Sequence, residues 1–369
     1  MDPVKILRRA WYILWNYRAL WMFGLILALA VGSSAGRGPN HNYRYEQHNQ
    51  HNSQVTPHSM QEAFHQFQAE IHKLLTQGIP QIHATGKDIT TFLWVIGAFV
   101  FVLLLTGIGM AIARYVSETA VIRMVDEYEG TGNKMTVRQG FRTGWSNTSW
   151  RLFLINLIVN LPAIVGFLIV AMSAAAFVFT AAKDKARLTP VSLLFEVGSV
   201  ILVIFITAIV TILLRLLRNF FWRICVLENA SVGDSFRRGA ALVRENWKNV
   251  GLMWLVMIGL GIVWAVGSII LVFISIPVVI VTAIVAALVV ALPFLLFVGI
   301  FSAFLGGYLP WLAGGLFVAP LFFTLAFSPW LLLGSWQSVY TSTVWTLTYR
   351  EIKALSALAI TPQAEPVGD

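Results

Sequence analysis

The chain has 369 residues, of which 57% are hydrophobic and 12% charged, whereas about a quarter of the residues of soluble domains are charged. A mean hydropathy of +0.74 therefore excludes an ordinary soluble domain. The net charge is +9, and the basic residues cluster beside apolar segments, where they would set membrane topology and contact anionic head groups rather than nucleic acid. The single cysteine, Cys225, excludes an intramolecular disulfide and a multi-thiolate metal site.

Residues 1–32 are predicted to form an interfacial helix that leads into a first span. Between residues 4 and 17, apolar side chains share one helical face and basic side chains lie largely on another, which is typical of helices at a membrane surface. We expect this segment to be a signal anchor. A cleaved signal peptide is the alternative, because the apolar run 19–31 ends in the small residues 32–35.

Residues 33–90 are predicted to be an extracytoplasmic loop rich in His, Asn and Gln. It contains every histidine of the chain: His41, His48, His51, His58, His65, His72 and His83. A spacing of seven residues places helical neighbours about 10 Å apart, which is too far for them to share an ion. Only His48 and His51 have a chelating spacing, so no metal site and no cofactor is predicted. Residues 59–77 are predicted to form an amphipathic helix.

Residues 91–350 are predicted to form an all-α, polytopic transmembrane helix bundle with amphipathic surface helices. Charge-free windows of about 20 residues or more mark the spans, because a charge at the bilayer centre costs several kcal/mol. The stretch between Lys248 and Arg350 contains no charged residue, and breaks at 275–277 and 306–310 favour three spans within it. The whole chain then has six to seven spans, with eight as an alternative, and residues 351–369 are predicted to be a polar, disordered tail.

Basic loops set the expected orientation. Segments 114–151 and 215–248 are rich in arginine and lysine and are therefore predicted to be cytoplasmic, with the N-terminus on the same side. The loop 33–90 is then outside. One short turn opposes this assignment, because it carries Lys183, Lys185 and Arg187.

An internal repeat organises the predicted cytoplasmic side, in segments of about 114–181 and 209–275. The sequence TVRQGFRTG at 136–144 matches SVGDSFRRG at 231–239. Each copy opens with a hydroxyl residue, Thr136 or Ser231, followed three positions later by a side chain able to complete a capping box. Each copy is therefore predicted to begin a surface helix, with its apolar face on the membrane: Val137, Phe141 and Trp145 in the first copy, and Val232, Phe236, Ala240, Val243 and Trp247 in the second.

The lead-in KILRRAWYILWNYRALWMFGLILAL, the segment SFRRGAALVRENWKNV and the closing YTSTVWTLTYREI resemble a group of uncharacterised bacterial polytopic membrane proteins. That group is similar to the membrane domain of some glycerophosphoryl diester phosphodiesterases. The resemblance implies a fold only, because the catalytic barrel of those enzymes, with its acidic and histidine motifs, is absent from this sequence.

Few residues suggest chemistry. Glu196 is the only acid within a predicted span, and intramembrane acids often mark ion paths, although this one lies near the outer boundary. Arg142, Arg237 and Arg238 could bind lipid phosphates. Asp126, Glu127 and Glu129 form an acidic cluster on a predicted loop, where they would cap or solvate a turn. No set of catalytic residues is recognised.

These patterns predict a non-enzymatic component of the prokaryotic cytoplasmic membrane. We expect a scaffold that interacts with anionic membrane lipids, or a partner of envelope machinery that binds another membrane protein. A small transporter or permease is the alternative, favoured by the repeat and weakened by the scarcity of polar groups within the spans.

Overall fold

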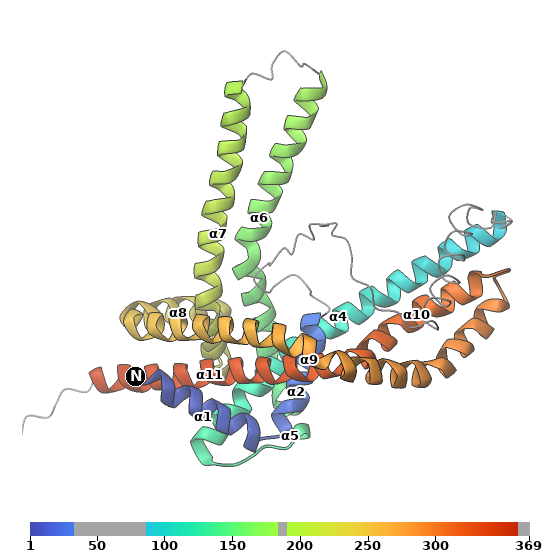
Figure 1. Cartoon of the computed structure of the whole chain (residues 1–369). Helices are drawn as coiled ribbons and strands as arrows, with labels where there is room; N and C mark the ends of the chain where they lie inside the picture. The colour runs from blue at the N-terminus through green and yellow to red at the C-terminus, as the bar shows by residue number, and fades with distance from the viewer. Residues whose placement is uncertain (33–85, 184–189, 361–369) are drawn as a thin grey trace, which may run out of the picture. The chain divides into compact units, whose positions relative to one another are not determined.

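The computed structural model describes residues 1–32, 86–183 and 190–360. Every regular element in these ranges is an α-helix, which confirms the predicted fold class (Figure 1). The helices are α1 (Pro3–Asn16), α2 (Ala19–Gly32), α4 (Gly86–Thr131), α5 (Val137–Gly144), α6 (Asn147–Lys183), α7 (Pro190–Leu227), α8 (Val232–Glu245), α9 (Trp247–Ser302), α10 (Leu309–Ala326) and α11 (Ser328–Ile360).

Within the described ranges, five helices are long and apolar enough to cross a membrane. The candidate spans are Thr90–Thr131, Asn147–Phe179, Leu194–Leu227, Trp247–Ser302 and Leu309–Ala326, and the bent pair α1–α2 would add a sixth. Most of the exposed large apolar side chains lie on these helices, as expected where lipid is the solvent. The chain is thus a multi-pass membrane protein.

The segment after Lys248 differs in part from the prediction. The expected break at 306–310 is present, because α9 ends at Ser302 and Gly307 adopts a left-handed φ of 64°. The break expected at 275–277 is absent, since α9 continues through it. In apolar surroundings, backbone N–H and C=O groups have no water to bind. A continuous helix leaves fewer of them without a hydrogen bond than a break does, which favours continuation through Pro277. With 56 residues, α9 is much longer than the about 20 residues that one span needs.

Helix α11 also departs from the expected pattern. It is not among the candidate spans, because its middle is rich in hydroxyl residues, several of which are buried: Ser335, Ser342, Thr343, Thr346 and Thr348. It also continues to Ile360, so the first part of the segment 351–369, expected to be a disordered tail, is helical. The prediction is wrong for residues 351–360.

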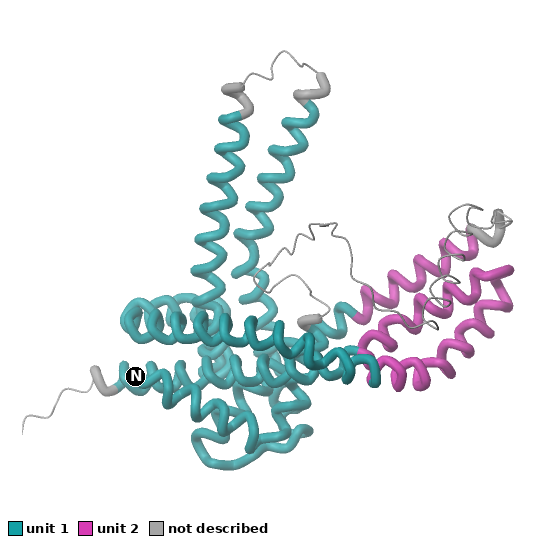
Figure 2. Tube along the Cα trace, in the orientation of Figure 1, with its two compact units in different colours: residues 1–33, 107–281, 327–369 teal, residues 34–106, 282–326 magenta. Residues whose placement is uncertain are grey.

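The chain divides into two compact units (Figure 2). Unit 2 consists of residues 34–106 and 282–326. Its described core is aromatic, because the ring of Phe317 on α10 lies 5.1 Å from that of Phe99 on α4 and 5.4 Å from that of Phe301 on α9. Gly314 permits the close approach of α10 to Val298, where a β-carbon would lie 2.7 Å from a methyl group.

Unit 1 consists of residues 1–33, 107–281 and 327–369. Helix α11 packs on α1, α2 and α7, while α7 packs on α6 and α8. The side chains of Ile13, Leu20 and Phe23, from α1 and α2, are buried in the same cluster as Val339 of α11. The core of unit 1 is therefore incomplete without residues 1–32.

Helices α1 and α2 meet at an angle of 100°. The bend is held by hydrogen bonds: Tyr17 Oη donates to the carbonyl oxygen of Met135 at 2.9 Å, and Trp21 Nε1 donates to that of Leu14 at 2.8 Å. Aromatic rings gather at the bend, where Trp15 lies 5.6 Å from Trp21 and 5.4 Å from Trp336 of α11. The predicted lead-in helix therefore exists, and it packs against α11.

The two surface helices begin as predicted. Thr136 and Gln139 form a complete capping box at the start of α5. At the start of α8, Ser231 accepts a hydrogen bond from the backbone nitrogen of Asp234. Both caps satisfy backbone donors that the first helical turn leaves free.

Both surface helices also pack through small residues onto the long helix that precedes them. On α5, Gly140 faces Met124 and Gly144 faces Ala120. On α8, Ser235 lies against Cys225, and Gly239 lies against Phe221. Small residues four positions apart let two helices approach closely. The sequence repeat is therefore accompanied by an equivalent set of packing contacts.

This packing predicts the effect of Gly144→Ala. A β-carbon at this position would lie 2.5 Å from the carbonyl oxygen of Val116, so backbone would have to move. We expect a loss of about 1–3 kcal/mol, in the range of other overpacked sites, seen as a lower midpoint of thermal unfolding in detergent. Gly233→Ala on α8 is the control, since nothing lies within 4 Å of its added carbon. Equal midpoints for the two variants would contradict the proposed packing.

The orientation can be tested at Asn133, which is exposed between α4 and α5. Asn133→Cys should resist an impermeant thiol reagent in intact cells and react after permeabilisation, whereas Asn49→Cys should react in both. Cys225 is fully buried and gives a silent background, which also makes it unsuitable as a topology probe itself. Reaction of Asn133→Cys in intact cells would reverse the predicted orientation.

Candidate functional site

Three arginines predicted to bind lipid phosphates lie on the two surface helices. Arg142 on α5 and Arg237 on α8 are exposed, and within the described residues neither has a hydrogen bond or an ion pair. Arg238 is different, because its Nη1 lies 3.3 Å from a carboxylate oxygen of Glu228. Arg142 and Arg237 are therefore free to bind an external anion, whereas Arg238 is already paired with Glu228.

The apolar faces of the surface helices are used differently. Val137 and Phe141 of α5 and Trp145 at its C-cap are 38%, 46% and 63% exposed, while the glycines of that helix are buried. On α8, the ring of Phe236 packs at a tilt against that of Phe221, with 4.4 Å between the ring centroids, and Val232 and Val243 also pack against the core. Only Ala240 and Trp247 of the predicted α8 face are exposed.

The expectation that both surface helices turn an apolar face outward is thus wrong for most of α8. The physical reason is that Phe236 and Val232 gain more by filling space beside Phe221 and Trp222 than by remaining outside. The set of Val137, Phe141 and Trp145, called the α5 stripe below, is the face that remains open.

Two further arginines hold the loops that carry the surface helices. Arg123 of α4 donates to the carbonyl oxygen of Thr143 at 2.7 Å and to Thr148 Oγ1 at 3.1 Å. Arg151 of α6 donates to the carbonyl oxygens of Asn229 and Ala230 at 3.0 and 3.2 Å. A cation at such carbonyls offsets the negative end of the helix dipole. These arginines position the site and are not available to a ligand.

A third group of arginines lies inside unit 1. Arg223 of α7 is 1% exposed and donates to the carbonyl oxygen of Ser342 on α11 at 3.0 Å. Ser342 Oγ donates in turn to Glu118 of α4 at 2.8 Å, and this carboxylate lies 4.0 Å from Arg223. A buried charge is tolerated only when it is paired and hydrogen-bonded. This arrangement ties α4, α7 and α11 together.

A second buried arrangement links α4, α6 and α7. Arg218 donates to Asn156 Oδ1 at 3.0 Å and lies over the ring of Trp222, 4.7 Å from its centroid. Asn156 donates to Tyr115 Oη at 2.8 Å. Arg114 and Arg215 are close enough to Arg218 for their charges to repel it. The carboxylate of Glu118 also acts on Arg218 and attracts it, so three positive charges lie near one negative charge.

Glu196 lies near the start of α7 and accepts a hydrogen bond from Ser173 Oγ of α6. Nineteen residues separate it from Arg215, which corresponds to about 29 Å along a helix. A hydrocarbon core is about 30 Å thick. The two charges are therefore spaced as expected for residues at opposite boundaries of one span.

Glu228, just after α7, is the centre of an ionic cluster. Tyr349 Oη donates to it at 2.6 Å and Lys353 Nζ at 2.7 Å, both from α11, and Arg238 approaches from α8. Burial opposes ionisation, but the hydrogen bonds from Lys353 and Tyr349 prevail and hold the pKa of Glu228 below its ordinary value. Burial, followed by the bond to Glu228, raises the pKa of Tyr349.

The acidic cluster at 126–129 lies in the last turns of α4, so its assignment to a loop is wrong. Asp126 pairs with Arg350 of α11 at 2.5 Å, and Glu129 pairs with Arg9 of α1 at 2.7 Å. These acids join helices that are far apart in the sequence, which a turn-capping role would not do.

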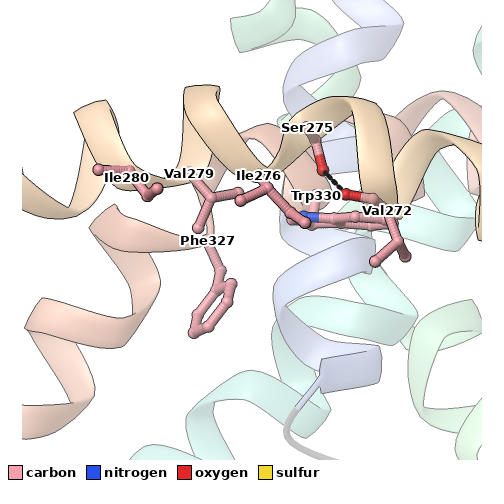
Figure 3. A pocket seen from close by; sticks show the side chains of 7 residues that line it. All are labelled: Val272, Ser275, Ile276, Val279, Ile280, Phe327 and Trp330. Atoms are coloured by element: carbon pink, nitrogen blue, oxygen red, sulfur yellow. Dashed lines mark hydrogen bonds between the residues drawn. The ribbon is translucent and has the colours of Figure 1, made fainter. Parts of the chain in front are cut away.

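An apolar hollow of about 400 Å³ lies between α9 and the start of α11 (Figure 3). Its hydroxyl group, Ser275 Oγ, already donates to the carbonyl oxygen of Val272 at 3.0 Å. Figure 3 shows the remaining labelled side chains, which are apolar apart from the indole of Trp330. The hollow offers no chemistry beyond packing.

Metal chemistry has no support in the described ranges, where no three His, Cys, Asp or Glu side chains are grouped to hold an ion. The predicted loop helix at 59–77 and all seven histidines lie outside the described residues. The absence of a metal site at His48 and His51 therefore stays a prediction.

Sequence reasoning missed both buried arrangements, the one around Arg223 and the one that joins Arg218 to Asn156. Asn156 and Asn160 stand four residues apart in an otherwise apolar segment, and this spacing was the one available signal. The partners of the two arginines could not be read from the sequence, because Asn156 is 62 positions from Arg218 and Ser342 is 119 positions from Arg223.

Comparison with known proteins gives a family without a function. A family model described as a family of unknown function (DUF7544) matches residues 10–346. No curated protein and no solved structure matches the chain. Any statement about activity must therefore come from the residues themselves.

The lowered pKa of Glu228 makes a prediction about acid stability. A carboxylate whose pKa is depressed by folding stabilises the protein above its unfolded pKa of about 4.3, and this contribution is lost as the pH falls further. Glu228→Gln should therefore unfold at a lower temperature than wild type at pH 7, with the difference shrinking towards pH 3.

Glu245→Gln is the matched control, because Glu245 is exposed at the end of α8 and has no ion pair within the described residues. Its unfolding temperature should follow that of wild type at each pH. If the unfolding temperatures of Glu228→Gln and wild type differed by the same amount at every pH, the stability of the cluster would not depend on the ionised carboxylate.

Proposed function

The chain belongs to the DUF7544 family, and we propose that it is a non-enzymatic, lipid-interacting component of the prokaryotic cytoplasmic membrane. In this role it serves as a scaffold, or as a partner of envelope machinery that binds another membrane protein. The proposal is supported by the surface helices and not by any reactive group.

The observation that carries the proposal is the open α5 stripe beside free cations. Val137, Phe141 and Trp145 are exposed, and the neighbouring Arg138 and Arg142 have no partner among the described side chains. An exposed apolar face flanked by arginines is typical of a helix that lies in the membrane interface. Helix α5 acts in this proposal as an amphipathic anchor on the inner leaflet.

The surroundings of α5 fit the same role. Trp145 lines an apolar groove of about 480 Å³ together with Trp150 and Phe153 of α6 and Ile112 of α4. Tryptophan is enriched at membrane interfaces because its ring is apolar and its N–H can reach water. The groove continues the α5 stripe onto two candidate spans.

Helix α8 adds charge rather than apolar surface. Arg237 and Arg244 are exposed without a partner within the described ranges, and each basic residue near an anionic surface contributes about 1 kcal/mol. Arg238 contributes less, because Glu228 already neutralises it.

A small transporter is the alternative, favoured by the repeated unit of long helix, surface helix and long helix. Glu196 is the residue that such a transporter would use. Its bond to Ser173 and its expected depth at the interface favour the scaffold. The resemblance to the membrane domain of glycerophosphoryl diester phosphodiesterases stays a prediction about fold and adds no activity.

The proposal predicts that the free arginines set lipid preference. In nanodiscs, the full-length protein should favour dansyl-labelled phosphatidylglycerol over dansyl-labelled phosphatidylcholine, measured by energy transfer from tryptophan. Arg142→Gln and Arg237→Gln should each weaken this preference about fivefold, the equivalent of about 1 kcal/mol. Arg238→Gln is the matched control and should change the preference for phosphatidylglycerol less than twofold.

Two results would contradict the scaffold. One is an unchanged lipid preference in Arg142→Gln and Arg237→Gln. The other is a proton or solute flux in proteoliposomes that Glu196→Gln abolishes, which would establish the transporter instead.

A further inference from the structure

A groove of about 430 Å³ runs between α6 and α7 in the part of the hairpin that is predicted to cross the membrane. Its lining residues include Ala163, Gly166 and Phe167 of α6, and Ala208, Thr211 and Arg215 of α7.

The two helices approach closely beside this groove. A β-carbon at Gly166 would lie 2.5 Å from Thr207 Oγ1, so only glycine permits this contact. Next to this contact, the small side chains of Ala163 and Ala208 do not fill the space between α6 and α7. The groove is therefore a consequence of the residues that pack α6 against α7.

Three polar side chains of α7, four residues apart, line the groove. Thr207, Thr211 and Arg215 share one face of α7, because positions four apart are neighbours on a helix. Thr211 is 6% exposed, and its Oγ1 is buried without a hydrogen-bond partner. A buried hydroxyl without a partner is costly, and Thr211 lines the groove.

Arg215 ends this row as an exposed cation without a partner within the described residues. Arg114 and Arg218 add positive charge nearby. The spacing from Glu196 places Arg215 at the boundary of the hydrocarbon core, at the end of the hairpin nearer α8. The groove is thus apolar within the core and cationic at one interface.

We infer that this groove holds one phospholipid with an anionic head group. Arg215 binds its phosphate, and Arg114 and Arg218 favour a net negative head group. The Thr211 hydroxyl donates to an ester carbonyl oxygen of the lipid. One acyl chain lies along Ala163, Gly166 and Phe167.

This inference rests on the proposed function and deepens it, because it names one retained lipid in addition to the lipid layer beneath α5. The two differ in their residues. Arg142 and Arg237 govern general surface preference, while Thr211 and Arg215 govern the single lipid.

Native mass spectrometry of the full-length protein in detergent, with phosphatidylglycerol or phosphatidylcholine added, tests the inference. Wild type should retain one phosphatidylglycerol. Arg215→Gln should lower its occupancy about fivefold, as expected for one cation at an anionic surface. Thr211→Val, which keeps the side-chain shape, should lower it roughly threefold, as expected for one hydrogen bond.

Ala208→Phe should displace the lipid by filling the groove, whereas Leu213→Phe, on α7 but outside the groove lining, should not. All variants must elute as wild type on size exclusion. Equal retention of phosphatidylcholine, or full occupancy in both Arg215→Gln and Ala208→Phe, would overturn the groove site. Loss of the bound lipid in Arg142→Gln alone would assign it to the surface helix instead.

Discussion

The structure depends on one constraint: backbone polar groups that cannot reach water must be satisfied inside their own helix. This requirement favours the continuation of α9 through Pro277 and accounts for the purely helical character of the described chain. Irregular backbone occurs where polar side chains can support it, as at Asn229, which has a φ of 55° and lies beside Arg151. Asn229 lies between α7 and the surface helix α8. The same constraint therefore places the surface helices at the ends of the long apolar helices.

The duplicated unit shows how one packing device can serve two purposes. Gly140 and Gly144 of α5, like Ser235 and Gly239 of α8, allow a surface helix to lie close to the long helix before it. After that shared step the copies diverge. Phe236 turns into the core, while Phe141 remains exposed. The first copy therefore provides an apolar surface, and the second provides mainly charge.

Apart from the arginines that pair with Glu129, Glu228 and Asp126, three sets of arginines differ in their partners, and this difference supports the proposed role. Arg123 and Arg151 neutralise loop carbonyl groups, and Arg223 is enclosed by Ser342 and Glu118. Arg142, Arg215 and Arg237 have no internal partner within the described residues. A structural role accounts for the first two groups. The third group has no such internal role, and these are the residues for which we propose anionic lipid as the partner.

The sequence by itself determined the helical class, the caps at Thr136 and Ser231 and the apolar segments. These features depend on neighbours within a few turns, so local pattern is sufficient. Only the tertiary structure decided that Arg223 meets Ser342, that Asp126 meets Arg350 and that Phe236 faces Phe221. Such contacts join distant positions, and their energy depends on which helices pack together. The groove beside Thr211 belongs to the same class, because it exists only where Gly166 brings α6 against α7.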